Sequence, residues 1–529
     1  MRVPKRSITG ADWLGMKPYD RFGSYDQFYL KLAQEIHELI KQEELKPFFL
    51  ALNIDNDQEK TLAIILVSYF EDQVNQIGLW QAVVDQFRAE FGYSVPFFDL
   101  EDYEDGELNW QDLAFLIWYF FSQVSGQVIS VEHPLVKIIS TVVSVYFKAQ
   151  WDRAPQTDFY EEYLIIDPEE ERDFFLLKEK LSWLALDSYL MRLDLGGRFK
   201  DSLEKVIGDR VTRLDEGLLH GVSYTMQNTF IFGSKSSMGG FHVPQLLSRV
   251  IDASDEFLAS LEKPFPMYEG RFKLTGKDDQ YYHFLDLKHD LEIPVVLKSV
   301  EMAEEFYQPD SSFYSSLVKW KGEWWVSGFV ISREHKKDES VAAALPFALL
   351  SEEQQKTMRE STEIMKRVFH EKFGRGFRTF ESVGEANEQI GEFLTQYNEA
   401  IMEELDEKRA LDQVMPNLTE AQADKHGRVG IGFDDGVGLM IMPTLPGIID
   451  LLQQEKDWTE EEEAQLYFSL FESQMPIGVG LELLANYPVG RIKEPIKASN
   501  RDVIPYAKYL LCFSDPESFG DRNPQMEGV

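Results

Sequence analysis

The sequence has a single cysteine, Cys512, in 529 residues. One cysteine excludes an intramolecular disulfide and a cysteine-based zinc site, and it is typical of proteins from a reducing compartment. The longest apolar run, residues 113–121, is far shorter than the roughly 20 residues of a membrane-spanning helix. The basic start, residues 1–8, has no apolar run behind it, so no signal peptide is predicted. We therefore expect a cytoplasmic protein with no membrane association.

Basic residues are also scarce: Lys and Arg number 53 against 91 Asp and Glu, a net charge of −38. This charge repels phosphate backbones, so nucleic acid is an unfavourable partner, and a protein partner is expected to be preferentially basic. The simpler interpretation of the acidic excess is that it keeps the protein soluble.

Common catalytic and metal-binding motifs are absent, including H-E-x-x-H, C-x-x-C and G-x-S-x-G. The glycine pairs at 430–432 and 436–438 have no Lys-Ser/Thr behind them, so turn chemistry explains them better than phosphate binding. His283, Asp286 and His289 have a suggestive spacing. On a strand, however, the two histidines share a face and Asp286 points the other way. The sequence therefore predicts no metal, no cofactor and no catalytic residue.

Hydrophobic residues make up 44% and aromatic residues 13% of the chain, which is ample for folded domains. Helical periodicity dominates. Asn109 can cap a helix whose residues 115–121 are apolar nearly all round, which predicts a central core position. Further helices are expected over 351–374 and 384–408, and residues 428–433 and 437–442 read as a β-hairpin.

The stretch 266–332 is different, because aromatic residues alternate with polar ones at the two-residue period of strands. Five strands are predicted, the last from Glu323 to Ser332, with Lys321-Gly322 as a tight hairpin loop. The fold class is therefore α+β: a mainly helical body, an embedded small antiparallel β-barrel-like module, and a C-terminal helical region with a hairpin. The expected domains are 1–263, 264–338 and 339–529.

Two neighbouring tryptophans of the last predicted strand, Trp324 and Trp325, point to opposite faces. Both faces of this strand are apolar, so one fills the module's own core. The other covers the helical body or forms a binding patch, and packing within the chain is the more common outcome.

Two further segments are candidates for ligand or partner binding. The Gly- and Ser-rich stretch Gly233–Gly240 reads as a flexible loop whose amides and Lys235 could cradle an anion, although most such loops bind nothing. A basic cluster lies at the end of the 351–374 helix, where the helix dipole already favours cations. Its alternative role is to recognise an acidic partner or the chain's own acidic surface; the cluster comprises Lys366, Arg367, Lys372, Arg375 and Arg378.

Six short segments, most of them aromatic, carry a resemblance: Met16-Lys-Pro-Tyr-Asp20, Phe28-Tyr-Leu-Lys-Leu32, Ser68-Tyr-Phe-Glu-Asp72, Phe115-Leu-Ile-Trp-Tyr-Phe120, Gly322-Glu-Trp-Trp-Val-Ser-Gly328 and Gly432-Phe-Asp-Asp-Gly-Val-Gly438. Together they resemble an uncharacterised bacterial family, a domain of unknown function, over most of the chain. Because that family has no established activity, the resemblance implies a shared architecture and a bacterial origin, and it assigns no catalytic residue.

These observations favour a cytoplasmic, non-catalytic protein-interaction or regulatory protein. Its candidate binding residues are Trp324, Trp325, Lys235, Arg375 and Arg378. The alternative is an enzyme whose active site is assembled only by the fold and acts on a small anionic or phosphorylated substrate. The sequence alone does not decide between an interaction protein and an enzyme.

Overall fold

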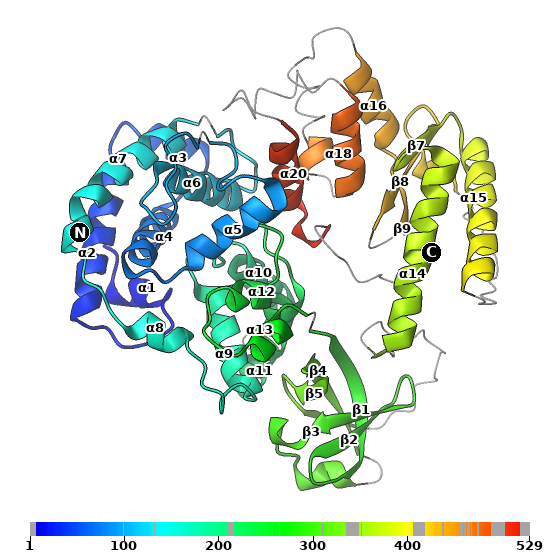
Figure 1. The fold of residues 1–529 in the computed structure, drawn as a ribbon, viewed down its shortest axis with the longest axis horizontal. Helices are drawn as coiled ribbons and strands as arrows, with labels where there is room; N and C mark the ends of the chain where they lie inside the picture. Colours follow the sequence, from blue (N-terminus) through cyan, green and yellow to red (C-terminus); the bar gives the residue numbers. More distant parts are fainter. Residues whose placement is uncertain are drawn as a thin grey trace. The chain divides into compact units, whose positions relative to one another are not determined.

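The computed structural model describes residues 7–98, 100–131, 133–208, 216–263, 265–308, 311–334, 349–350, 352–405, 418–435, 438–454, 459, 462, 466, 468–472, 475–487 and 503–518. These residues fall into two compact units. Unit 1 lies within Met1–Ala343, and unit 2 lies within Ala344–Glu494 and Arg501–Val529. The fold class is α+β, as predicted (Figure 1).

Helices build unit 1 as far as Leu261. The most buried of them is α6 (Trp110–Ser125), in which every side chain from Gln111 to Ser122 is buried. This confirms the predicted central helix and follows from its apolar residues on all sides. The remaining helices are α1 (Gly10–Leu14), α2 (Ser24–Ile40), α3 (Lys46–Ala51), α4 (Asn56–Asn75), α5 (Leu79–Phe91), α7 (Pro134–Gln150), α8 (Phe159–Leu164), α9 (Phe174–Ser182), α10 (Leu195–Ile207), α11 (Glu216–Asn228), α12 (Val243–Ser248) and α13 (Asp255–Leu261).

A small barrel follows the helices in the same unit. The hydrogen-bonded order β1-β2-β3-β5-β4 closes on itself because β4 also pairs with β1, and β6 extends the sheet beside β4. The pairs are antiparallel except for β3 and β5, which are parallel at Val295 and Trp324, so the barrel is mixed. Closure leaves no open sheet edge among the five barrel strands. The strands are β1 (Met267–Lys277), β2 (Tyr281–Asp286), β3 (Leu291–Val296), β4 (Ser311–Trp320), β5 (Glu323–Val326) and β6 (Ile331–Glu334).

One predicted strand of the barrel was wrong. The continuous strand expected over Glu323–Ser332 is two strands, because β5 ends at Val326 and β6 begins at Ile331. The backbone between them leaves the barrel at Ser327 and contacts α11 instead, where the Phe329 amide lies 3.3 Å from the Thr225 hydroxyl. Tertiary contacts therefore interrupt a stretch whose local pattern favours a strand throughout.

Unit 2 is a three-stranded antiparallel sheet in the order β7-β8-β9 with helices on both faces. One face of β8 presents Val429, Ile431 and Phe433 to a core shared with α14 and α15. The other face has Gly430 and Gly432, where an added Cβ would lie within 3 Å of Leu445 and Val479, so these glycines permit close helix packing. The elements are α14 (Glu352–Phe373), β7 (Phe377–Phe380), α15 (Val383–Glu404), β8 (Val429–Asp434), β9 (Gly438–Ile441), α16 (Leu445–Gln453), α18 (Ile477–Asn486) and α20 (Val503–Ser514).

Among the residues that the structure describes, no helix combines the length and apolar character needed to cross a bilayer. The hairpin of β8 and β9 and the helix ending before Gly374 confirm their predictions. The strand β7 was not predicted. The division into three domains at 263/264 and 338/339 stays a prediction about which parts fold independently.

Candidate functional site

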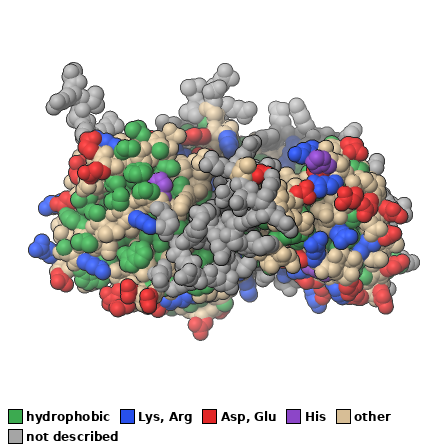
Figure 2. Space-filling view, turned by 90° about the horizontal axis from the view of Figure 1, so that it is seen from above, with side chains coloured by type: hydrophobic (Ala, Val, Ile, Leu, Met, Phe, Trp, Pro, Cys, Tyr) green, Lys and Arg blue, Asp and Glu red, His purple; other side chains and the backbone are tan. Residues whose placement is uncertain are grey.

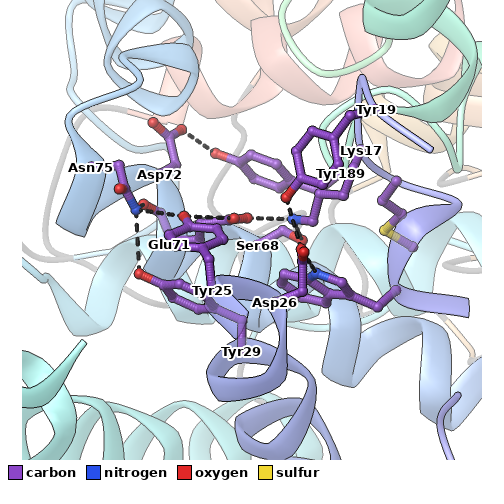
Figure 3. A network of polar contacts seen from close by, with 12 residues as sticks. Lys17, Tyr19, Tyr25, Asp26, Tyr29, Ser68, Glu71, Asp72, Asn75 and Tyr189 are labelled. Carbon is purple, nitrogen blue, oxygen red and sulfur yellow. Dashed lines mark hydrogen bonds and ion pairs between the residues drawn. The ribbon is translucent and has the colours of Figure 1, made fainter. Parts of the chain in front are cut away.

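A network of buried polar side chains lies in unit 1, where the segment between α1 and α2 meets α4 (Figure 3). The Lys17 amine donates to the Ser68 hydroxyl at 3.1 Å and forms an ion pair with Glu71. Lys17 lies in the Met16–Asp20 segment, and Ser68 and Glu71 lie in the Ser68–Asp72 segment. The structure thus brings together two segments that carry the family resemblance.

The Lys17–Glu71 pair is removed from water, with side chains 2% and 1% exposed. Burial lowers the pKa of Lys17 and raises the pKa of Glu71, and the attraction between the two charges opposes both shifts. The amine also lies 3.7 Å from the centre of the Trp13 ring, a cation–π contact that favours its charged form. The Tyr25 hydroxyl donates to the second Glu71 oxygen at 2.9 Å, so both oxygens of this carboxylate have donors.

Asp26 is the second acid of the network. Its Oδ1 accepts hydrogen bonds from the Trp13 indole at 2.9 Å and the Tyr19 hydroxyl at 2.8 Å, and its Oδ2 accepts from the Gly23 amide at 2.8 Å. Asp26 lies in the first turn of α2, where a negative charge is favoured by the helix dipole. Asp26 thereby fixes the segment that carries Lys17 to the start of α2.

Two more buried carboxylates lie on α4 and α6. Asp72 accepts from the Trp80 amide at 2.7 Å and the Tyr189 hydroxyl at 2.6 Å, and burial nevertheless raises its pKa to about 6. Asp112 on α6 accepts from the Tyr69 hydroxyl at 2.7 Å, and burial raises its pKa to about 7. Both acids tie α4 to neighbouring parts of the helical body.

Shifted pKa values of this kind are typical of active sites, but also of structural ion-pair networks. Here the side chains of Lys17, Glu71, Asp72 and Asp112 are all buried, so a substrate would have no access to them in this conformation. The arrangement instead fixes the relative positions of α2, α4 and α6, since a half-satisfied buried network is costly. The sequence analysis missed this network. The detectable signal was charged residues embedded in otherwise apolar, aromatic segments.

The predicted flexible loop Gly233–Gly240 is buried in the same unit, so that expectation was wrong. Its polar groups are satisfied internally: Asp194 accepts from the Ser236 hydroxyl at 3.0 Å and the Ser237 amide at 2.6 Å. The Lys235 side chain is itself buried, and its carbonyl accepts from Arg198 at 2.5 Å. Because these partners come from α10 and the turn before it, loop composition could not reveal them. The predicted anion cradle at Lys235 stays a prediction.

Residues 7–263 match the model of a family described as "Protein of unknown function (DUF3843)". This confirms, for these residues, the resemblance to an uncharacterised family. The DUF3843 match ends just before the barrel, so it includes the buried polar network, whereas the segments Gly322–Gly328 and Gly432–Gly438 lie beyond it. No curated protein and no solved structure matches the chain significantly.

The barrel packs on the helices of unit 1 through Trp325. Its ring stacks on Phe174 of α9 with centroids 5.3 Å apart and meets Phe175 edge-on at 6.5 Å. Trp324 lies on the opposite face of β5, the same face as Val326. Val326 pairs with Leu317, which lies on the interior face of β4. Both tryptophans are buried, Trp324 towards the barrel interior and Trp325 at the contact with the helices.

The cations of the basic cluster in unit 2 do not converge on one place. Lys366 pairs with Asp435 at 2.8 Å and Lys372 with Glu392 at 2.8 Å, and Arg367 pairs with Glu404. Arg375 lies over the Phe377 ring at 4.3 Å, and Arg378 is exposed on β7. Three of the five cations thus neutralise acids of the chain itself, one of the two alternatives that the sequence left open.

The expectation that His289 shares a strand face with His283 was wrong, whereas His283 and Asp286 lie on opposite faces of β2 as predicted. His289 lies in the turn after β2 and its ring is 2.5 Å from the Asp286 carboxylate, whereas His283 lies outside the barrel between Asp278 and Glu292. Within the part of the chain that the structure describes, no three His, Cys, Asp or Glu side chains are placed to hold a metal ion.

Proposed function

We propose that this chain acts by binding another protein through one exposed face of α7, and not by catalysis. The observation that carries the proposal is a stripe of exposed apolar side chains at Ile138, Val142 and Val145, with exposures of 42%, 38% and 67%. Spacings of four and three residues place them on one face of the helix. Such i, i+4, i+7 anchors are typical of helix-mediated recognition.

A neighbouring helix also exposes an apolar side chain. Leu50 of α3 is 74% exposed, and its neighbour Phe48 contacts the His133 ring at the start of α7 at 5.7 Å. Figure 2 shows hydrophobic side chains gathered on the helical side of unit 1, where Figure 1 places α3 and α7. Single exposed apolar residues are normal on a protein surface, whereas grouped ones mark interaction sites.

The charge on this face indicates the chemistry of the partner. The helix α7 has two lysines, Lys137 and Lys148, and no acidic residue, in a chain with a net charge of −38. We expect an acidic amphipathic helix to pack along the stripe. A second copy of α7 fits less well, because an antiparallel pair would bring Lys137 of one copy towards Lys148 of the other. The charge of the whole chain favours a basic partner, so the local and global charges make opposite predictions.

The reaction-based alternative receives less support. The groups of the buried network whose pKa values are shifted, Lys17, Glu71, Asp72 and Asp112, lie in the core of unit 1 rather than at an accessible surface. Substrate chemistry needs groups within hydrogen-bonding reach of a substrate. Such groups stabilise the scaffold that presents α7.

The experiment compares proteins retained from native lysate by the unmodified chain and by Val145→Asp. Val145 is exposed, so we expect the substitution to leave the melting temperature nearly unchanged while removing a stoichiometric partner. Val206→Asp on α10 is the matched control, because Val206 is also an exposed valine (52%) but lies outside this face. Lys148→Glu should weaken the same association.

Three results would contradict the proposal or part of it. Identical retained proteins for Val145→Asp and the unmodified chain would exclude α7 as the binding face. Stronger retention by Lys148→Glu would indicate a basic partner. A dimer that Val145→Asp converts to a monomer in sedimentation would identify a second copy of the chain as the occupant.

A further inference from the structure

The contact between barrel and helices has a second, polar part around the connector from Ser327 to Phe329. This connector lies along one face of α11, formed by Gly221, Thr225 and Asn228 at spacings of four and three residues. The Phe329 ring occupies the space above Gly221, where an added Cβ would lie 1.2 Å from the ring. An added Cβ on Gly328 would likewise lie 2.6 Å from the Thr225 hydroxyl. The connector and α11 therefore fit each other closely.

Lys178 of α9 is enclosed in this contact with a side chain only 2% exposed. Its amine lies 3.0 Å from the Ser327 hydroxyl and 3.4 Å from the Tyr224 carbonyl, and 3.3 Å from the centre of the Tyr224 ring. The Ser327 hydroxyl in turn donates to the Asn228 side-chain oxygen at 2.9 Å. The lysine thus bridges the barrel connector and the helical body.

Among the residues that the structure describes, no carboxylate pairs with Lys178. From α11 the facing groups are Tyr224 and Asn228, and from the barrel they are Ser316 and Ser327. The phenol of Tyr224 is the titratable group among them, and burial raises its pKa, so it stays neutral. His220 lies one turn before Tyr224 on α11. Its ring stacks on the Tyr224 ring with centroids 6.4 Å apart, and its side chain is exposed.

Desolvation is the dominant influence on Lys178, and it lowers the pKa of the amine to about 7. Lys17 differs, because the attraction of Glu71 opposes the effect of burial on its pKa. The Tyr224 ring and carbonyl favour the charged amine, but without a carboxylate they do not outweigh its loss of hydration.

We propose that docking of the barrel on α9 and α11 is coupled to the release of one proton from Lys178. When the contact opens, the amine regains water and its ordinary affinity for a proton. The docked form therefore binds fewer protons than the open form between pH 7 and about 10.5, so docking strengthens as the pH rises through this window. Below about pH 7 the amine is protonated in both forms, and the docking equilibrium no longer depends on it.

The experiment measures hydrogen exchange at the amides of Ser327 and Phe329, corrected for the intrinsic exchange rate, from pH 7 to 9.5 in the intact chain. The Phe329 amide donates across the contact to Thr225 Oγ1 at 3.3 Å, and the Ser327 amide beside it donates to the Ser316 carbonyl of β4 at 2.9 Å. One coupled proton gives a tenfold change in the opening equilibrium per pH unit. We expect Lys178→Met to reduce the slope of protection against pH by one logarithmic unit per pH unit relative to the unmodified chain.

Lys180→Met is the matched control on the same helix, since Lys180 is also buried but its amine donates to the Tyr163 carbonyl, away from the barrel. It should leave the slope at Ser327 and Phe329 unchanged. If Lys178→Met does not fold, the unmodified chain still tests the proposal. Protection at the connector must rise with pH by at least one logarithmic unit per pH unit more than at the β8 amides of unit 2. The proposal would be overturned if the slopes were equal with and without Lys178, or if Lys180→Met changed the slope as much as Lys178→Met. It would also be overturned if the connector and the β8 amides showed the same dependence on pH.

Discussion

The interiors of the two units are built differently. Unit 1 buries several titratable groups, among them Lys17, Glu71, Asp72, Asp112 and Lys178. In the described part of unit 2, Asp434 is the only buried Asp, Glu, Lys or Arg, and the core between α14, α15 and the sheet is formed by apolar side chains. Unit 2 instead keeps its charges on the surface, in pairs such as Lys366–Asp435.

This difference predicts where each unit is sensitive to its surroundings. A buried charge is expensive to leave without a partner and responds to pH, because folding changes its proton affinity. A surface pair is screened by salt and contributes little to stability. Unit 1 should therefore depend on pH and on single buried charges, and unit 2 mainly on apolar packing.

The largest expected effect comes from removing one partner of the buried pair in unit 1. Glu71→Ala leaves Lys17 in the core without its carboxylate, so we expect a loss of about 3–5 kcal/mol of unfolding free energy. Denaturant unfolding followed by tryptophan fluorescence measures this loss. The signal reports mainly on unit 1, because nine of the ten tryptophans belong to it and only Trp458 falls in unit 2. The double variant Lys17→Met with Glu71→Gln should recover most of the loss. A single-variant loss below about 1 kcal/mol would show that the pair is not a structural requirement.

The next effect is a pH dependence confined to unit 1. Burial raises the pKa of Asp112 to about 7 in the folded state, so between about pH 4 and 7 the folded protein holds a proton that the unfolded chain releases. Stability should therefore fall as the pH rises through this window, by about 4 kcal/mol from this group. In Asp112→Asn the unfolding free energy of unit 1 should no longer show this decrease between about pH 4 and 7. Parallel pH curves for the variant and the unmodified chain would contradict the assignment.

A smaller effect is expected at the contact between barrel and helices. The Trp325 indole nitrogen is buried and makes no hydrogen bond within the described residues, so its role is apolar packing on Phe174. Trp325→Phe keeps a stacked ring and should cost about 1–2 kcal/mol, less than the 3–5 typical of truncating a buried aromatic residue to Ala. Fluorescence-detected unfolding measures the loss of unfolding free energy. Trp324→Ala, which truncates a tryptophan of the barrel interior, is the comparison variant and should lose more. A loss of more than 3 kcal/mol would indicate that the indole itself is required.

Apolar periodicity and turn residues were enough to predict those elements whose structure is set by their own residues. The helix α6 and the hairpin of β8 and β9 follow from apolar periodicity and turn residues, and both are confirmed. The prediction of one continuous last strand was wrong beyond Ser327. There the backbone turns away from the barrel, so that Gly328 packs against Thr225 and the Phe329 ring against Gly221. These partners lie about one hundred residues earlier in the chain, and strand propensity does not register such contacts.

The candidate sites show the same limit. The buried network joins Lys17 to Glu71, and Lys178 meets Ser327, across long sequence separations. A single sequence shows that these lysines occur among apolar residues but not which groups they approach. Lys235 was selected because it lies in a Gly- and Ser-rich stretch, but the stretch is buried because Asp194 and neighbouring groups satisfy its polar atoms. Composition indicates conformational freedom only where no tertiary partner removes it.

The smallest expected effect tests the other side of the comparison, in unit 2. The Lys366 amine and the Asp435 carboxylate are 2.8 Å apart with side chains 38% and 64% exposed, so water and salt weaken their attraction. A double-mutant cycle with Lys366→Gln and Asp435→Asn, measured by far-UV circular dichroism, should give a coupling below about 1 kcal/mol at low salt. In 1 M salt the coupling should fall further, since screening then acts over about 3 Å. A coupling of 2 kcal/mol or more that persists in high salt would mean that unit 2 also depends on its charges, and the contrast between the two units would fail.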